Sequence, residues 1–171
     1  METWDAIRSR RNVRAFADRP IAGEDLDRIL EAAWRTPSSS NRQRWDFVVC
    51  TDREQLEALS KVWQWALHVA TSAATICLVA PRPQDGYERD SIQYDLGQAT
   101  MSIMLAAADQ GIGSCHAVVR DQELARRILG LPEDRFCPWM VALGYPADRP
   151  LAPIVRPNRR PLDSVVHRGR W

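Results

Sequence analysis

Two stretches of the sequence combine residue types that can bind a ligand. The first is RRNVRAF, residues 10–16, which holds three arginines. If the chain is extended there, Arg10, Asn12 and Arg14 lie on one side. Two guanidiniums and an amide on one side make a compact site for a single anion such as a phosphate. Taken alone, the stretch is more typical of a solvated run of charge.

The second stretch is TPSSSNRQRWDF, residues 36–47, which holds three serines, the amides of Asn41 and Gln43, and Pro37. It lies between the expected end of a helix and the expected start of a strand. Such a loop offers several hydrogen-bond donors and acceptors to a planar heterocycle. Taken alone, it is more typical of an ordinary polar loop.

Most other enzyme motifs are absent from the chain. There is no GxGxxG or GxxxxGK[ST] phosphate loop and no GxSxG elbow. The three histidines, His68, His116 and His167, lie far apart without HExxH spacing, so we expect no metal site and interpret each histidine as structural. We expect no catalytic side chain either, and chemistry would then need an organic cofactor.

Composition excludes some classes of function. Lys plus Arg is 23 and Asp plus Glu is 22, and this balance argues against a nucleic-acid module. Cys50, Cys77, Cys115 and Cys137 show no zinc or CxxC spacing, and three of them lie in apolar runs, which predicts buried thiols in a reducing compartment. The N-terminus lacks a signal-peptide pattern, and the most apolar stretch, 99–108, is too short to span a bilayer. We therefore expect a soluble, cytoplasmic protein.

Periodicity and capping residues predict a single domain of class α/β or α+β. Asp52 and Asp121 are expected helix N-caps, and Gly130 is an expected helix end. Pro81, Pro83 and Gly86 are expected to break the chain after a buried strand. The helices are expected at 3–9, 23–35, 52–67, 91–110 and 121–130, and the strands at 45–51, 74–80, 114–119 and 138–146.

Two regions indicate a partner. The run from Leu96 to Ala108 carries no charge, as in a helix that is buried on all sides. The tail, about 147–171, is rich in proline and arginine, and its apolar Val165, Val166 and Trp171 need a surface to cover them. We expect the tail to wrap along another subunit.

The motifs together resemble the nitroreductase family of FMN-dependent oxidoreductases. The start and the loop are similar to the family patterns RRSxRxF and APSSxNxQPWxF. YDLGQATMSIMLAAADQGIGSCHAVV resembles its long central helix and the following strand. ILGLPEDRFCPWMVALGYP and RRPLDSVVHRGRW resemble its later segments, so the resemblance covers nearly the whole chain. It implies an α+β nitroreductase-like fold, a mostly antiparallel sheet flanked by helices, and an intertwined homodimer with FMN at the interface.

The resemblance also implies the roles of individual residues. The FMN phosphate and ribityl chain would be held by Arg10, Arg11, Asn12, Arg14 and Arg159. The rest of the implied cofactor site comprises Pro37, Ser38 and Ser39 against the flavin bound mainly to the other subunit, Asn41 and Gln43 near its ring and ribityl oxygens, and the backbone of Ala117, Val118 and Val119 near N5.

The sequence departs from the family pattern in three places. Asn12 stands where serine is usual, and it still offers a donor. Arg44 replaces a proline and either places a cation near the flavin, favouring an acidic substrate or the nicotinamide cofactor's phosphate, or points to solvent. Between 61 and 74 a polar contact to the flavin is missing, and Trp63 and Trp65 there either stack in the substrate channel or pack in the core. The chain is also short for the family, which predicts an active site that is open and unselective or closed by something else.

The leading hypothesis is an FMN-dependent oxidoreductase that transfers hydride from NAD(P)H to a nitroaromatic, quinone or similar acceptor. A dehydrogenase or oxidase acting on a specific organic substrate is the first alternative, and a non-catalytic flavin-binding protein is the second. The sequence does not separate NADH from NADPH, and it leaves a deazaflavin open.

Overall fold

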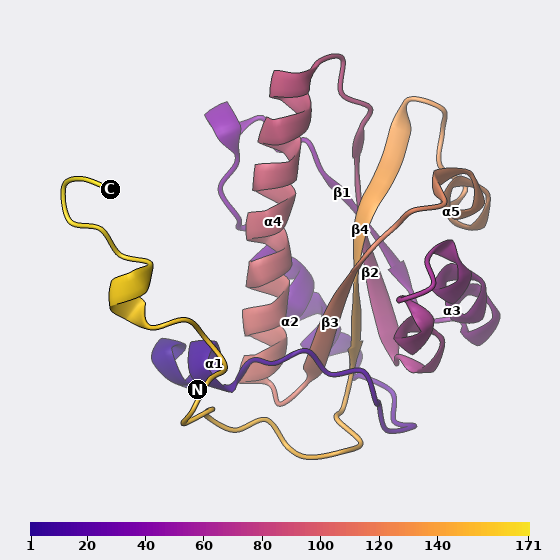
Figure 1. Cartoon of the computed structure of the whole chain (residues 1–171). Coiled ribbons are helices and arrows are strands. Elements are labelled where there is room, and N and C mark those ends of the chain that lie inside the picture. The colour runs from indigo at the N-terminus through magenta and orange to yellow at the C-terminus, as the bar shows by residue number, and fades with distance from the viewer.

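Four strands form the central sheet of the computed structural model, which describes residues 1–171 (Figure 1). All strand pairs are antiparallel, and the order across the sheet is β1-β2-β4-β3. The expected α+β class and mostly antiparallel sheet are therefore confirmed. The strands are β1 Asp46–Cys50, β2 Ala74–Pro81, β3 Gly113–Val118 and β4 Arg135–Gly144.

Helices cover both faces of the sheet. Helices α2 and α4 lie on one face, and α3 and α5 lie on the other (Figure 1). The helices are α1 Thr3–Ser9, α2 Gly23–Trp34, α3 Arg53–Leu59, α4 Gly86–Asp109 and α5 Gln122–Leu129, and the short 3₁₀ turns are η1 Ser39–Asn41, η2 Ser60–Val62, η3 Leu67–Thr71 and η4 Leu162–Ser164.

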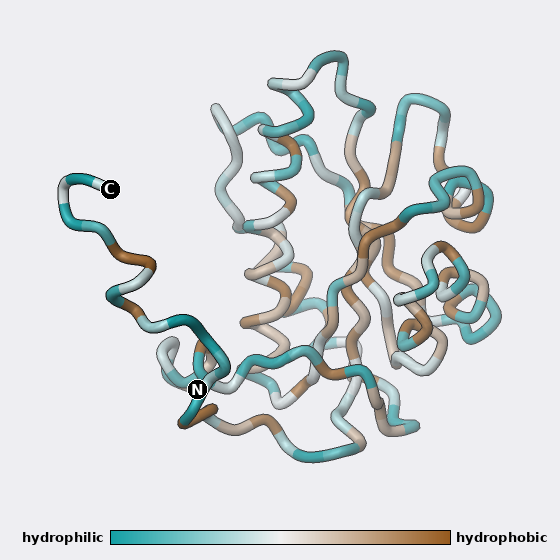
Figure 2. Tube along the Cα trace, in the orientation of Figure 1, coloured by the Kyte–Doolittle hydropathy of each residue, from teal (hydrophilic) through white to brown (hydrophobic).

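Side-chain alternation along β2 explains why there are two cores. Ile76 and Leu78 pack against α2 and α4, whereas Cys77 and Val79 pack against the α3 and α5 layer. Successive strand residues point to opposite faces, so a strand covered on both faces is apolar throughout. The hydropathy colouring shows brown, apolar segments along the strands of the sheet (Figure 2). All four cysteines are buried, as expected.

The expected caps are confirmed. The Asp52 carboxylate accepts a hydrogen bond from Gln55 N (2.9 Å), and Asp121 accepts one from Leu124 N (2.8 Å). Gly130 ends α5 in the left-handed conformation at φ 65°, where a residue with a Cβ is disfavoured.

The expected helix 52–67 is wrong in its second half. Helix α3 ends at Leu59, and the chain then passes through η2 into an extended Trp63. The carbonyl oxygen of Val62 accepts hydrogen bonds from Arg120 N (3.2 Å) and Asp121 N (3.0 Å) instead of continuing a helix. The segment that carries Trp63 and Trp65 is therefore shaped by a contact between residues far apart in the sequence.

Two further boundaries are corrected. Helix α4 begins at Gly86, five residues earlier than expected, because Asp85 caps it through Glu88 N at 2.7 Å. Gly86 therefore opens the helix and does not break the chain. Strand β4 begins at Arg135 and runs through Pro138, beside a register irregularity in its pairing with β2. A proline lacks the N–H that regular pairing needs, so it is tolerated at an irregularity.

The tail leaves the domain after β4. Its remote part extends beyond α1 without packing on the sheet (Figure 1), and Val155, Leu162 and Trp171 are exposed. One hydrogen bond, from Ile154 N to the Arg8 carbonyl oxygen at 3.0 Å, ties the tail to α1. That it wraps on a second subunit stays a prediction. No helix is both long and apolar enough to cross a membrane.

Candidate functional site

The arginine-rich segment lies against the edge strand β3. Val13 N donates to the Ser114 carbonyl oxygen at 2.9 Å, and Asn12 forms a parallel bridge with Ser114. Val13 is fully buried over Gly113, where an added Cβ would lie 2.7 Å from Val13 Cγ2. The buried valine fixes the segment, and the polar residues on either side of it, Asn12 and Arg14, are exposed.

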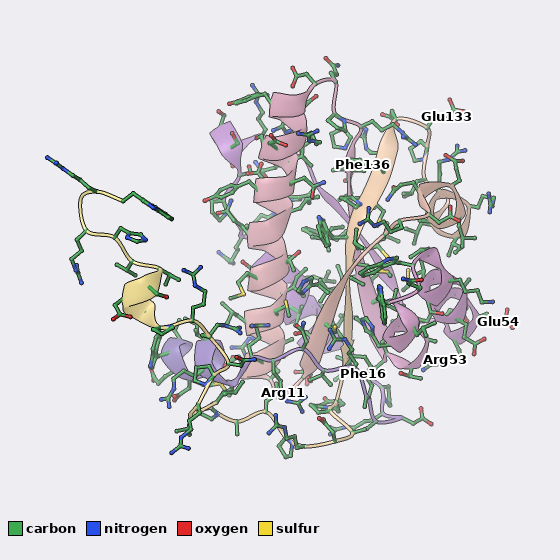
Figure 3. The ribbon with its side chains drawn as sticks, viewed as in Figure 1. Arg11, Phe16, Arg53, Glu54, Glu133 and Phe136 are labelled. Atoms are coloured by element: carbon green, nitrogen blue, oxygen red, sulfur yellow. The ribbon has the colours of Figure 1, made fainter.

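Arg11 is engaged with the start of the tail. Its Nη2 donates to Asp148 Oδ1 (2.7 Å) and to the Arg149 carbonyl oxygen (2.8 Å), and Figure 3 shows it at the lower edge of the domain. The guanidinium lowers the pKa of the Asp148 carboxyl. Arg11 lines none of the depressions described below, so the structure does not place it with the other predicted phosphate ligands.

Three depressions follow one another along this edge of the molecule, and we call them together the groove. The tail depression (450 Å³) is lined by Arg8, Arg10 and Arg159 and by apolar residues of α1 and the tail. The central depression (430 Å³) shares Arg10 with it and lies between α4 and β3. The tryptophan depression (760 Å³) shares His116 with the central one. The predicted residues Arg10 and Arg159 are therefore brought together.

Arg14 opens onto the far end of the groove. It lines the tryptophan depression with Trp63, Trp65 and His68, and it lines neither of the other two. Four residues of extended chain span about 13 Å, so Arg10 and Arg14 reach different parts of the groove.

His116 lies between the two arginines and was not predicted. Its ring stands edge-on to Trp139, with the centroids 6.3 Å apart. Partial burial lowers the pKa of His116, and the charges of Arg10 and Arg14 lower it further. The sequence offered one signal, since this histidine directly precedes the predicted backbone site at Ala117.

The outer edge of β3 presents backbone groups to the groove, of which the His116 carbonyl oxygen accepts a bond from Cys115 Sγ at 3.7 Å. Because Ser114 directs its carbonyl oxygen to the N-terminal segment, the alternate residues His116 and Val118 direct their N–H and C=O groups to the same edge. No strand pairs with that edge beyond Ser114. Of the predicted backbone, Val118 is thus available, whereas Ala117 faces β4 and Val119 N donates to the Pro138 carbonyl oxygen at 3.0 Å.

The serine-rich loop is held in an uncommon conformation. Ser40, Asn41 and Gln43 all have positive φ, at 51°, 52° and 49°. Gln43 N donates to Ser38 Oγ at 2.9 Å. Non-glycine residues with φ in this range are few and cluster at functional sites.

Asp95 fastens the loop to α4. The carboxylate is buried, and Ser39 N donates to its Oδ1 at 3.0 Å and to its Oδ2 at 3.2 Å. Thr36 Oγ1 adds a bond to Ser102 Oγ at 3.0 Å. Asp95 was not predicted, because its role depends on a segment 56 residues away.

Arg44 is neither a free cation nor pointed to solvent. Its Nη1 donates to Glu88 Oε1 (3.0 Å) and its Nη2 donates to Ser91 Oγ (2.8 Å), and the side chain is only 12% exposed. The ion pair binds the loop to the first turns of α4. Arg44 therefore serves as a third anchor of the loop in this chain, and its charge is compensated.

One chain does not bring the two predicted halves of the site together. Pro37, Ser38 and Ser39 line a separate depression of 480 Å³ beside Tyr87 and Tyr94 of α4. It shares no lining residue with the groove. Two copies of the chain are needed if both halves are to contact one ligand, as the resemblance implies.

Fold and groove together define an α+β protein with an arginine-lined groove along the edge of its sheet. The model of the Nitroreductase family matches residues 7–145. A protein of Archaeoglobus fulgidus assigned to the NADH dehydrogenase/NAD(P)H nitroreductases is 34% identical over 99% of both chains. The chain belongs to the nitroreductase family.

Two solved structures show the same fold. An FMN-dependent nitroreductase from Clostridium difficile R20291 superposes with a TM-score of 0.86 at 25% identity, over 97% of this chain and 98% of the other. The NADPH:FMN oxidoreductase from Vibrio harveyi, complexed with NAD+, superposes with a TM-score of 0.84 at 25% identity, over 97% of this chain and 76% of the other. The expected fold and family are confirmed.

Proposed function

We propose that this protein is an FMN-dependent oxidoreductase that takes hydride from NAD(P)H and delivers it to a nitroaromatic, a quinone or a similar acceptor. Membership of the nitroreductase family supports NAD(P)H-dependent flavin chemistry. The observation that carries the proposal is the groove, in which Arg10 and Arg159 lie at one end, a free strand edge follows, and aromatic side chains lie at the other. That order suits a ligand with a phosphate at one end and a flat ring at the other.

The residues of the groove fit FMN chemically. Arg10 Nε is buried without a hydrogen-bond partner, and a buried donor in that state is stabilised by an anionic acceptor. Arg10 and Arg159 would hold the phosphate, and the N–H of Val118 would donate to an acceptor atom of the ring. When bound, FMN accepts and gives up two electrons with a proton as hydride.

The protein itself binds, orients and excludes water. Hydride transfer through a flavin needs no protein acid or base. The protein therefore contributes by positioning the bound groups and by the charges it places around them. We infer that Pro37, Ser38 and Ser39 of each subunit close over the flavin of the other. The three anchors on α4 keep this loop in one shape before the ligand arrives, which lowers the entropic cost of binding.

The test is spectroscopic. We expect the purified protein to show a flavin absorption band or to gain one when titrated with FMN. Anaerobic NADH or NADPH should then bleach the band, and an added nitroaromatic should restore it. A protein that binds no FMN contradicts the proposal as a whole, whereas bound FMN that neither nucleotide bleaches contradicts the reductase activity.

A further inference from the structure

His116 is the one titratable side chain of the sheet that opens onto the groove. It lines both the central and the tryptophan depressions. The side chain is exposed, and its imidazole forms no hydrogen bond to the protein. The neighbouring ring of Trp139, in contrast, is held by a bond from its Nε1 to Gln93 Oε1 at 2.6 Å. Both ring nitrogens of His116 are therefore free to meet a ligand or a proton.

The strand places His116 beside the proposed cofactor. His116 and Val118 lie on the same face of β3, because side chains two residues apart in a strand point to the same side. About 7 Å of strand separates the two residues, which is less than the length of three fused rings. A flavin ring that accepts a hydrogen bond from the Val118 N–H therefore lies next to the imidazole.

Few charged or titratable groups face His116. Arg10 and Arg14 reach it from the N-terminal segment, and His68 reaches it from η3. The residues that α4 and β4 contribute to the two depressions are all uncharged. Partial burial lowers the pKa of His116, and the charges of Arg10 and Arg14 lower it further. Since the ordinary value is about 6.5, the imidazole is neutral at pH 7 in the ligand-free protein.

A bound and reduced cofactor would reverse this balance. A phosphate monoester carries about two negative charges at neutral pH, so it would compensate the charge of Arg10. Hydride brings two electrons and one proton, and its transfer to a neutral ring leaves one further negative charge there. A negative charge within about 4–6 Å favours the protonated form of a histidine. Reduction therefore favours an imidazolium at His116.

We propose that His116 takes up one proton from solvent when the flavin is reduced, and holds it while the flavin stays reduced. This inference rests on the proposed function. With His as the His116 imidazole, the balance is FMN + NAD(P)H + His + H⁺ → FMNH⁻ + HisH⁺ + NAD(P)⁺. One C–H bond of the nicotinamide breaks, the hydride forms a bond to the flavin, and the solvent proton forms an N–H bond at the imidazole.

Potentiometry of the FMN-loaded protein counts the protons that accompany two electrons. The protein is reduced stepwise with dithionite in the presence of redox dyes, from about pH 5.5 to 9. Each proton changes the midpoint potential by about 30 mV per pH unit, which is tenfold in the equilibrium constant for two electrons. We expect two protons, and thus twice this slope, near neutral pH, and one proton above the pKa that His116 has in the reduced protein.

Three substitutions assign the second proton to a residue. His116→Gln removes the titrating ring and keeps a polar side chain, so the slope near neutral pH should fall twofold, to that of one proton. His68→Gln removes the other histidine of the tryptophan depression and should keep the wild-type slope. His167→Gln, in the exposed tail, is the matched control and should also keep it. Flavin content, measured on each variant, confirms that the cofactor is bound.

Three results would overturn the inference. The first is uptake of a single proton across the whole range in the wild type. The second is a two-proton slope that persists in His116→Gln, which would place the proton on the flavin. The third is loss of that slope in His68→Gln alone, which would place it on His68.

These results are distinguishable from a failure of the proposed function. Dithionite replaces NAD(P)H as the reductant, so the slope can be measured even if neither nucleotide bleaches the flavin, an outcome that contradicts the reductase activity alone. A protein that binds no FMN contradicts both the proposed function and the role of His116.

Discussion

Neighbouring arginines with the same chemistry take different roles because the backbone points them differently. Arg10 enters the end of the groove that also holds Arg159, Arg11 turns to the tail, and Arg14 reaches the aromatic end. Burial of Val13 sets this division, since it fixes which neighbours can face the ligand. The two roles can be tested separately. Loss of a phosphate-binding arginine should lower the affinity for FMN, whereas loss of an arginine that anchors the tail should lower stability.

Arg10→Ala should lower FMN affinity by roughly 10–100-fold, the equivalent of one or two charged hydrogen bonds. Arg11→Ala should leave the affinity nearly unchanged and lower the thermal midpoint, because it releases the Asp148 contact. Flavin fluorescence titration and thermal unfolding of both variants separate the roles. An equal loss of affinity in the two would contradict the division.

His68 should make the stability of the apoprotein sensitive to acid. Burial lowers the pKa of its imidazole, and the charge of Arg14 lowers it further, as does nearby His116. In the unfolded chain the pKa of a histidine is about 6.5. Between that value and the lower folded pKa the unfolded state binds more protons, so stability is full above pH 6.5 and falls as the pH falls through this window.

His68→Leu should flatten this dependence, measured as the free energy of urea unfolding at pH 7.5, 6.5 and 5.5. His167→Leu, in the exposed tail, is the control and should keep the wild-type slope. A His68→Leu slope equal to that of the wild type would show that other groups cause the acid sensitivity.

At the scale of elements, the contact between the N-terminal segment and β3 builds the groove. Gly113 allows it, because a Cβ there would lie 2.7 Å from Val13 Cγ2 and 2.8 Å from Val13 Cβ. A second such contact lies on the neighbouring strand β4, where a Cβ on Gly144, the register partner of Gly113, would meet the ring of Phe16 (labelled in Figure 3) at 2.8 Å. Gly113 and Gly144 thus let the irregular segment that carries Val13 and Phe16 pack closely against the ends of β3 and β4.

Gly113→Ala should destabilise the protein by about 1–3 kcal/mol, the usual cost of overpacking, and should weaken FMN binding, because Val13 must move and carries its polar neighbours with it. Gly23→Ala is the matched control, since nothing lies within 4 Å of its added Cβ. Urea unfolding and flavin titration of both variants test the claim, and wild-type stability in Gly113→Ala would refute it.

The sequence was informative where structure is local. Helix caps such as Asp52 and Asp121, and the alternation along β2, follow from neighbours in the chain. The end of α3 could not be predicted in this way, because the Val62 carbonyl oxygen accepts hydrogen bonds from residues nearly 60 positions later in the chain. For the same reason Asp95, Arg44 and His116 acquire their roles only once α4, the loop and β3 are placed side by side.

At the scale of the whole molecule, the chain leaves apolar surface uncovered. The outer face of α4 carries Tyr94, Gly97 and Met101 without a charge between them, and Tyr94 is 72% exposed. The tail adds further exposed apolar side chains, seen as brown segments away from the domain (Figure 2). Contiguous exposed apolar surface marks an interface, and the proposed cofactor site, whose two halves lie apart in one chain, would need one.

We therefore expect a homodimer in which α4 packs against its counterpart and the tail crosses to the partner, burying more than ~2,000 Å². Met101→Glu should weaken the dimer on the order of 10³-fold, because an unpaired carboxylate in a buried interface costs several kcal/mol. FMN should be lost with it, both because the two subunits contribute to each proposed site and because Met101 itself lines the groove. Arg127→Glu on α5 should leave the dimer intact. Sedimentation equilibrium with flavin content reports both quantities, and a Met101→Glu protein that stays dimeric and fully loaded with FMN would place the interface elsewhere.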